Sequence, residues 1–69
     1  MKLTNSIKQH RARLELTQQD LAARAGVRRQ TIIALEKGKY APSALLAFRI
    51  AHELGMKVDE LFELEEEGG

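Results

Sequence analysis

The chain has 69 residues, no cysteine and a formal net charge of +1. A chain this short buries only roughly 60% of its unfolded surface, so its stability margin is thin. Without cysteine, neither a disulfide nor a thiolate zinc site adds stability, which leaves the core and a partner subunit to supply it. No apolar run approaches the roughly 20 residues that span a bilayer, and the N-terminus lacks the apolar region of a signal peptide. We therefore expect a soluble, cytoplasmic protein that forms one domain over residues 1–69.

Charge is unevenly divided along the chain. Residues 1–40 contain nine Lys or Arg against three Asp or Glu, a net charge of +6, whereas residues 41–69 contain two against seven, a net charge of −5. A basic half suits the binding of a polyanion, which would repel the acidic half. We expect the acidic tail within residues 62–69 to point away from a bound nucleic acid.

Apolar residues recur at approximately helical spacing near the N-terminus, namely Leu3, Ile7, Leu14 and Leu16. They predict an amphipathic helix over about residues 4–14 with one face in the core. A second helix is predicted over about residues 18–25. The Thr17 hydroxyl is placed to cap this helix, and Asp20, its third residue, is placed to reach back in a capping box.

A sharp turn is predicted between the second helix and a third, which covers about residues 28–36. Gly26 permits the positive φ that such a turn needs, and Gly38 is placed to cap the end of the third helix. Small residues on the second helix, namely Ala22, Ala23 and Ala25, allow another helix to approach closely. The third helix directs Ile32 and Leu35 inward. These two segments form a helix-turn-helix.

The third helix opens with side chains that donate hydrogen bonds, namely Arg28, Arg29, Gln30 and Thr31. Arginine pairs with guanine and glutamine with adenine in the major groove, at roughly 1–3 kcal/mol of discrimination each. The N-terminal end of a recognition helix is the end that meets the bases. The sequence therefore predicts binding to double-stranded DNA.

Two more helices and an extended segment are predicted after Pro42. Ser43 caps a helix over about residues 43–54, and Gly55 ends it. Its inward stripe comprises Ala44, Ala47, Ile50, Ala51 and Leu54. A short helix over about residues 57–61 carries Val58 and Leu61. The alternation of apolar and acidic residues over 62–65 then predicts a half-buried strand, followed by a frayed end at residues 66–69.

More apolar residues are present after residue 44 than one helix stripe requires, namely Leu45, Leu46, Phe48 and Leu64. All four could pack into the core of so small a fold. Alternatively, Leu45, Phe48 and Leu64 form a self-complementary dimer interface, which we expect. His10 and His52 stand too far apart in sequence to predict a metal site, and no cofactor is expected.

From Ile7 to Phe62 the chain resembles the lambda-repressor-like helix-turn-helix family, the phage Cro and xenobiotic-response-element type of regulator. The matching blocks are Leu16–Ala22, Gly26-Val27, Gln30–Ile32 and Leu35–Ser43. The resemblance implies an all-α, five-helix fold whose second and third helices form the helix-turn-helix, followed here by a short extended segment. It is most similar to compact, single-domain regulators.

The resemblance also implies roles for individual residues. Gln18, at the start of the second helix, would bind a phosphate. The side chains that face base edges would be Arg28, Arg29, Gln30 and Ala34. The side chains that hold the DNA backbone would be Thr31, Lys37, Lys39 and Tyr40. Arg11 would form a structural ion pair with Glu36, and Arg28 stands where the family usually has a small capping Ser or Thr.

Other interpretations of some of these residues stay open. Gln18 is also an ordinary surface residue for a first helical turn, and Lys37 and Lys39 could act as partners of the third helix's dipole. Tyr40 could pack rather than bind phosphate.

Two functions are consistent with these features. The first is a homodimeric repressor that occupies its operator, with two recognition helices about 34 Å apart in successive major grooves. The second is a protein-interaction or antitoxin-like module, whose acidic tail or Phe48 and Leu64 surface binds a partner protein. An enzyme is not expected, because the chain lacks a converging nucleophile and base, a phosphate-binding glycine loop and a cluster of metal ligands.

Overall fold

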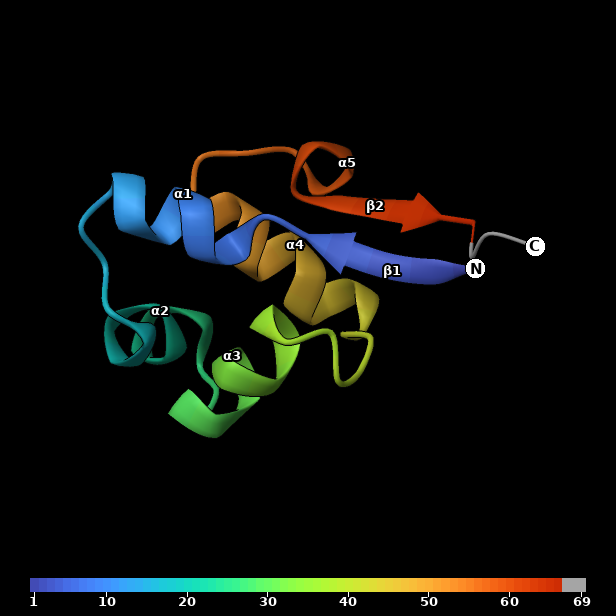
Figure 1. Cartoon of the computed structure of the whole chain (residues 1–69). Coiled ribbons are helices and arrows are strands. Elements are labelled where there is room, and N and C mark those ends of the chain that lie inside the picture. The colour runs from blue at the N-terminus through green and yellow to red at the C-terminus, as the bar shows by residue number, and fades with distance from the viewer. Residues whose placement is uncertain (67–69) are drawn as a thin grey trace.

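The computed structural model describes residues 1–66; residues 67–69, for which a frayed end was predicted, lie outside the described part. The elements in chain order are β1 (Lys2–Asn5), α1 (Ile7–Arg13), α2 (Gln18–Ala25), α3 (Arg29–Glu36), α4 (Ala44–Glu53), α5 (Val58–Leu61) and β2 (Phe62–Glu65). Figure 1 shows α2 and α3 together on one side of α4, and the two strands projecting from the other end beside the N-terminus. The five predicted helices and the strand at residues 62–65 are confirmed. None of the helices in the described part is long and apolar enough to cross a membrane.

The N-terminal segment differs from the sequence prediction. Residues 2–5 form β1 instead of entering the first helix, and α1 begins only at Ile7. β1 pairs antiparallel with β2, so that Leu3 lies opposite Leu64 and Asn5 opposite Phe62. The spacing of Leu3 and Ile7 fits a helix, but pairing with a strand almost 60 residues later overrides it.

The predicted capping box at the start of α2 is confirmed. The Asp20 N–H donates to the Thr17 hydroxyl at 3.0 Å, and the Thr17 N–H donates to the Asp20 carboxylate at 2.9 Å. These two bonds provide acceptors for two backbone N–H groups that would otherwise lack partners at the N-terminus of α2. At its other end α2 stops at Gly26, whose φ of +74° lies in the left-handed region. Both ends of α2 are therefore fixed by local chemistry.

The core is formed by apolar residues from every helix and from β2. Its buried members are Ile7, Leu21, Ala22, Ala25, Ile32, Leu35, Ala47, Ile50, Ala51, Leu54, Leu61 and Phe62. Two residues predicted to point inward do not. Leu14 is exposed because it lies past the last turn of α1 as its C-cap, and Ala44 is exposed because it is the first residue of α4, ahead of the packed turns.

The capping box makes the stability of the fold sensitive to acid. The pKa of Asp20 lies below its ordinary value of 3.8, chiefly because the Thr17 backbone N–H donates to the carboxylate, with the Thr17 side chain contributing as well. A lowered pKa in the folded state means that the stabilisation is complete above pH 3.8 and is lost as the pH falls through the lower, folded-state pKa.

We predict that Asp20→Asn lowers the free energy of unfolding at pH 7, and that the difference from the unsubstituted protein shrinks as the pH falls below about 3.8. Urea unfolding of both proteins between pH 7 and pH 2 measures this difference. A gap that stays constant down to pH 2 would contradict the assignment of this acid sensitivity to Asp20.

Candidate nucleic-acid interface

The N-terminal end of α3 presents an exposed set of hydrogen-bond donors. Arg28, Arg29 and Gln30 are exposed, whereas Ile32 and Leu35 on the opposite face are buried. The core therefore holds α3 by one face and leaves the other to solvent. This arrangement gives the two arginines and the glutamine room to reach a ligand.

Arg28 precedes the helix and does not cap it. Its backbone is extended, with φ −80° and ψ 152°, and its side chain makes no capping hydrogen bond. An arginine side chain has no short oxygen to accept a hydrogen bond from the first helical N–H groups, unlike serine or threonine. As a result α3 begins at Arg29, one residue later than predicted.

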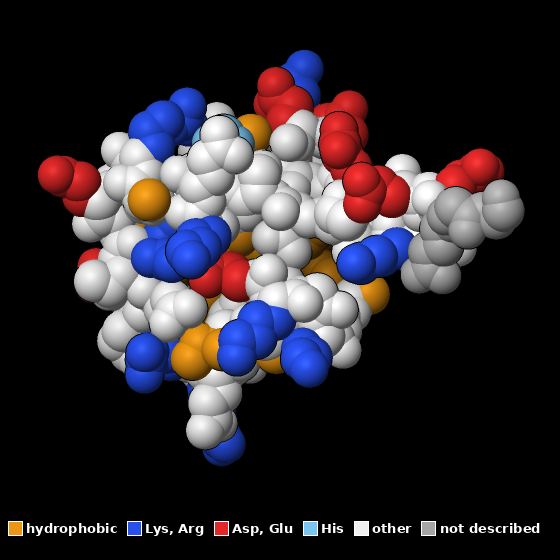
Figure 2. Space-filling view, viewed as in Figure 1, with side chains coloured by type: hydrophobic (Ala, Val, Ile, Leu, Met, Phe, Trp, Pro, Cys, Tyr) orange, Lys and Arg blue, Asp and Glu red, His pale blue; other side chains and the backbone are white. Residues whose placement is uncertain are grey.

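The other candidate contact residues lie along the same helix and the loop that follows it. Lys37, Lys39 and Tyr40 are exposed, and Thr31 and Ala34 are half-buried. Figure 2 shows Lys and Arg side chains over the part of the molecule that contains α2 and α3, and Asp and Glu side chains gathered around α5 and β2. The predicted charge asymmetry is thus also a separation in space, which suits a polyanion bound at α3.

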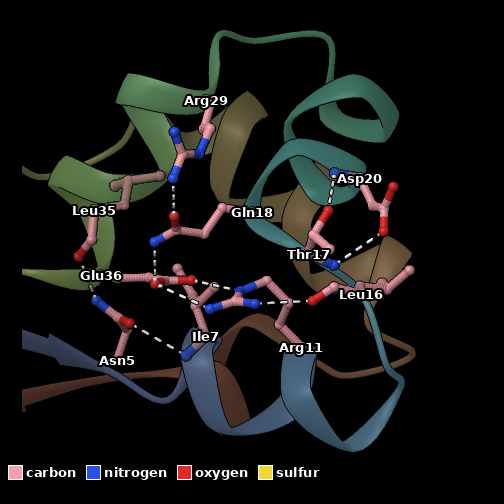
Figure 3. A network of polar contacts seen from close by, with 10 residues as sticks. All are labelled: Asn5, Ile7, Arg11, Leu16, Thr17, Gln18, Asp20, Arg29, Leu35 and Glu36. Carbon is pink, nitrogen blue, oxygen red and sulfur yellow. Dashed lines mark hydrogen bonds and ion pairs between the residues drawn. The ribbon is translucent and has the colours of Figure 1, made fainter.

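A largely buried ion pair lies directly behind this surface. Arg11 Nε donates to Glu36 Oε2 at 2.8 Å, and the two side chains are only 13% and 7% exposed. Arg11 Nη1 also donates to the Leu16 carbonyl at 2.8 Å. The predicted pairing of Arg11 with Glu36 is therefore present, and it joins α1 to the C-terminal end of α3 (Figure 3).

Gln18 extends this pair into a longer chain of hydrogen bonds. Its Nε2 donates to Glu36 Oε1 at 3.1 Å, and its Oε1 accepts a hydrogen bond from Arg29 Nη2 at 3.3 Å (Figure 3). Arg29 is thereby linked to the Glu36 carboxylate through the side chain of Gln18. The family resemblance implied that Gln18 binds a phosphate, with an ordinary surface position as the alternative, and neither indicated the bond to Arg29. The second hydrogen of its amide nitrogen remains available for such a phosphate.

Asn5 is a structural contributor that the sequence analysis missed. Its Nδ2 donates to the Leu35 carbonyl at 2.8 Å, and its Oδ1 accepts from the Ile7 N–H at 3.1 Å. The side chain thus anchors β1 to the last turn of α3 and to the start of α1. No local pattern could have indicated this role, because Leu35 lies 30 residues away.

The surface at the start of α3 is suited to binding a ligand through hydrogen bonds. The exposed side chains at the start of α3 offer N–H donors, which match the oxygen and nitrogen acceptors of phosphates and base edges. Among residues 1–66, no three His, Cys, Asp or Glu side chains are grouped in a way that could hold a metal ion.

Comparisons with known proteins agree with this geometry. A family model described as helix-turn-helix matches residues 7–61. An uncharacterized HTH-type transcriptional regulator from Methanothermobacter thermautotrophicus is 57% identical over 63 residues, which cover 90% of this chain and 91% of that protein. Another from Methanocaldococcus jannaschii is 52% identical over 65 residues, covering 94% of this chain and 98% of that protein.

The fold is also similar to a solved structure. The crystal structure of the clp gene regulator ClgR from Corynebacterium glutamicum matches with a TM-score of 0.74 and 28% sequence identity. The match covers 78% of this chain and 57% of that protein, so this chain spans a little over half of ClgR.

We predict that Arg11→Met or Glu36→Met alone lowers the free energy of unfolding by about 3 kcal/mol, because each change leaves a buried charge without its partner. The double substitution should cost no more than either single one, since it removes both charges together. Denaturant unfolding of the four proteins measures the coupling. Additive losses in the double variant would show that the pair contributes little as a unit.

We also predict that Arg28→Ser raises the free energy of unfolding by about 1 kcal/mol, because serine supplies the missing oxygen at the N-cap of α3. Arg28→Ala is the matched control, since it removes the same charge without adding an acceptor. Equal stabilities of these two variants in thermal melts would argue against a capping effect.

Proposed function

Because the chain belongs to the helix-turn-helix family of transcriptional regulators and is a DNA-binding regulator, we propose that it is a homodimeric repressor that acts by occupying its operator. Membership of this family confirms the resemblance drawn from the sequence. The observation that supports the proposal best is the exposed N-terminal end of α3, where three donor side chains stand together on a helix anchored from behind. Repression by occupancy requires only that the protein bind its operator.

The proposed contacts divide into base readers and backbone holders. Arg28, Arg29 and Gln30 read base edges, with the half-buried Ala34 one turn further along α3. Contacts to the phosphate backbone come from Gln18, Thr31, Lys37, Lys39 and Tyr40. The hydrogen bond from Arg29 to Gln18 supports this division, because it steadies a base-reading guanidinium beside a residue assigned to phosphate.

Exposed apolar side chains support the proposed homodimer. Leu45, Phe48 and Leu64 are 70%, 64% and 66% exposed. Large apolar side chains gain free energy when they are removed from water, and a second copy of the chain would cover them. The same exposure also supports the competing function, a protein-interaction or antitoxin-like module, in which a different protein covers these residues.

Selection of binding sites from a pool of randomised duplex DNA, at about 150 mM salt to suppress nonspecific binding, tests the proposal. Enrichment of a palindrome with half-sites one helical turn apart supports a homodimer on an operator. Enrichment of one half-site alone would indicate a monomeric regulator. Failure of the folded protein to enrich any site, together with a second protein that co-purifies in equal amount, would favour the interaction module.

We predict that Arg29→Ala and Lys39→Ala weaken DNA binding in different ways. Arg29→Ala should cost about 1–3 kcal/mol on the selected site and relax specificity at one base pair. Lys39→Ala should weaken binding to selected and scrambled sites alike and lower the slope of log K against log salt by about 1. Lys57→Ala, on the acidic side of the molecule, is the control that should leave binding unchanged.

Titration of each variant against both duplexes at several salt concentrations separates these effects. Equal losses on selected and scrambled sites for Arg29→Ala and Lys39→Ala would contradict the assigned roles.

A further inference from the structure

The two strands form a sheet with two unpaired edges. Within residues 1–66 the sheet contains β1 and β2 alone, and each strand is four residues long. A pair of strands this short is marginal by itself, and an unpaired edge offers N–H and C=O groups to another strand. The two edges differ in how well they suit pairing with another strand.

The hydrogen bond at the base of the sheet shows which backbone groups face outward. The Ser6 N–H donates to the Leu61 carbonyl at 3.0 Å, in the same register that pairs β1 with β2. Hydrogen-bonded and non-bonded pairs alternate along an antiparallel ladder. The opposed residues Leu3 and Leu64 therefore form a non-bonded pair, three steps along the ladder. Their N–H and C=O groups point away from each other, Leu3 toward the free edge of β1 and Leu64 toward the free edge of β2.

Charge distinguishes the two edges. Two copies joined through β2, with Leu64 at the centre, would place Glu63 of each copy opposite Glu65 of the other, and like charges directly opposite are unfavourable. Two copies joined through β1, with Leu3 at the centre, would place Lys2 opposite Thr4. Pairing through β1 therefore lacks the repulsion between like charges that disfavours pairing through β2.

The apolar face of the sheet agrees with this choice. Opposed residues of an antiparallel pair point to the same face, so Leu3 and Leu64 share one. Leu3 is half-buried and Leu64 is mostly exposed. Pairing through β1 would set the leucines of four strands in a single row, with the two copies of Leu3 in contact at its centre.

We propose that two copies of this chain pair antiparallel through the free edge of β1, with Leu3 at the two-fold axis, to form one four-stranded sheet. The inference rests on the proposed homodimer, and it places the contact at the β1 edge with Leu3 in place of the α4 residues Leu45 and Phe48. Because Asn5 anchors β1 to the Leu35 carbonyl, this pairing also fixes the two copies of α3 relative to each other, with their C-terminal ends toward the axis. The sheet is then the element that sets the spacing of the two DNA-binding helices.

A pair of proline substitutions tests the edge directly. Leu3→Pro removes an N–H that points outward, so it spares the bonds between β1 and β2 while blocking a strand at the β1 edge. Leu64→Pro is the matched control, since it removes the equivalent N–H from the β2 edge. Leu3→Ala controls for loss of the leucine side chain. Circular dichroism and thermal melts establish that each variant is folded.

We expect Leu3→Pro to raise the dimer dissociation constant by more than about 100-fold in sedimentation equilibrium. Leu64→Pro should raise it much less, because the Leu64 N–H points to the β2 edge and only its side chain adds to the apolar row. Leu3→Pro should also bind a palindromic duplex on the order of 100-fold more weakly, while it binds a single half-site as the unsubstituted protein does.

A charge substitution provides a second test if Leu3→Pro does not fold. Thr4 lies opposite Glu63 within the chain and opposite Lys2 of the second copy in the proposed dimer. Thr4→Lys should therefore stabilise the isolated chain and weaken the dimer, whereas Thr4→Glu should do the reverse. Effects of the same sign on chain stability and on dimerisation would overturn the proposed pairing.

The outcomes separate this inference from the function on which it rests. A dimer that survives Leu3→Pro but not Leu64→Pro would assign the interface to β2, and one that survives both would assign it elsewhere, such as the α4 face with Phe48. Either result overturns the β1 pairing and leaves the homodimer standing. An unsubstituted protein that stays monomeric on palindromic DNA would overturn both. A mass that grows beyond a dimer with concentration would indicate head-to-tail pairing of β1 with β2 and overturn the two-fold arrangement.

Discussion

The ion pair between Arg11 and Glu36 is the contact on which the arrangement of the DNA-binding helices depends. It is largely removed from water, and the cost of removing its charges from water is offset because each charge has its partner and further hydrogen bonds. Glu36 ends the recognition helix, Arg11 lies on α1, and Gln18 begins α2. One carboxylate therefore receives hydrogen bonds from two other helices, so a displacement of any one of the three strains the same site.

This network also connects the interior of the protein to the surface that we propose binds DNA. Arg29 is exposed, yet its guanidinium donates to Gln18, which donates to Glu36. A flexible side chain held in this way would lose less conformational freedom in the proposed contact with a base edge, so less of the binding energy would be needed to order it. Arg28 has no such partner within residues 1–66, and it lies ahead of the first helical turn. The two neighbouring arginines therefore differ in how firmly the fold positions them.

The sheet plays the corresponding role at the other end of the recognition helix. Asn5 ties β1 to the last turn of α3, while β1 pairs with β2 directly after α5. The recognition helix is thus supported through Gln18 near its start, through Glu36 and Asn5 near its end, and along its length by Ile32 and Leu35 in the core. The acidic residues of α5 and β2 lie away from this surface, where they do not oppose a polyanion (Figure 2).

The features that the sequence determined by itself are those whose signals lie within a few residues. The limits of α2 follow from Thr17, Asp20 and Gly26, and the buried stripes of α3 and α4 follow from helical spacing. The blocks that match the family around the helix-turn-helix are also short runs of residues, and they identified the fold and DNA binding. Only the tertiary structure decided that residues 2–5 form a strand, that Gln18 holds Arg29, and that Asn5 caps the end of α3. Each of these depends on a partner between 11 residues away, as for Gln18 and Arg29, and 63 residues away, as for Lys2 and Glu65. A local pattern carries no information about which distant group the folded chain will bring within hydrogen-bonding distance.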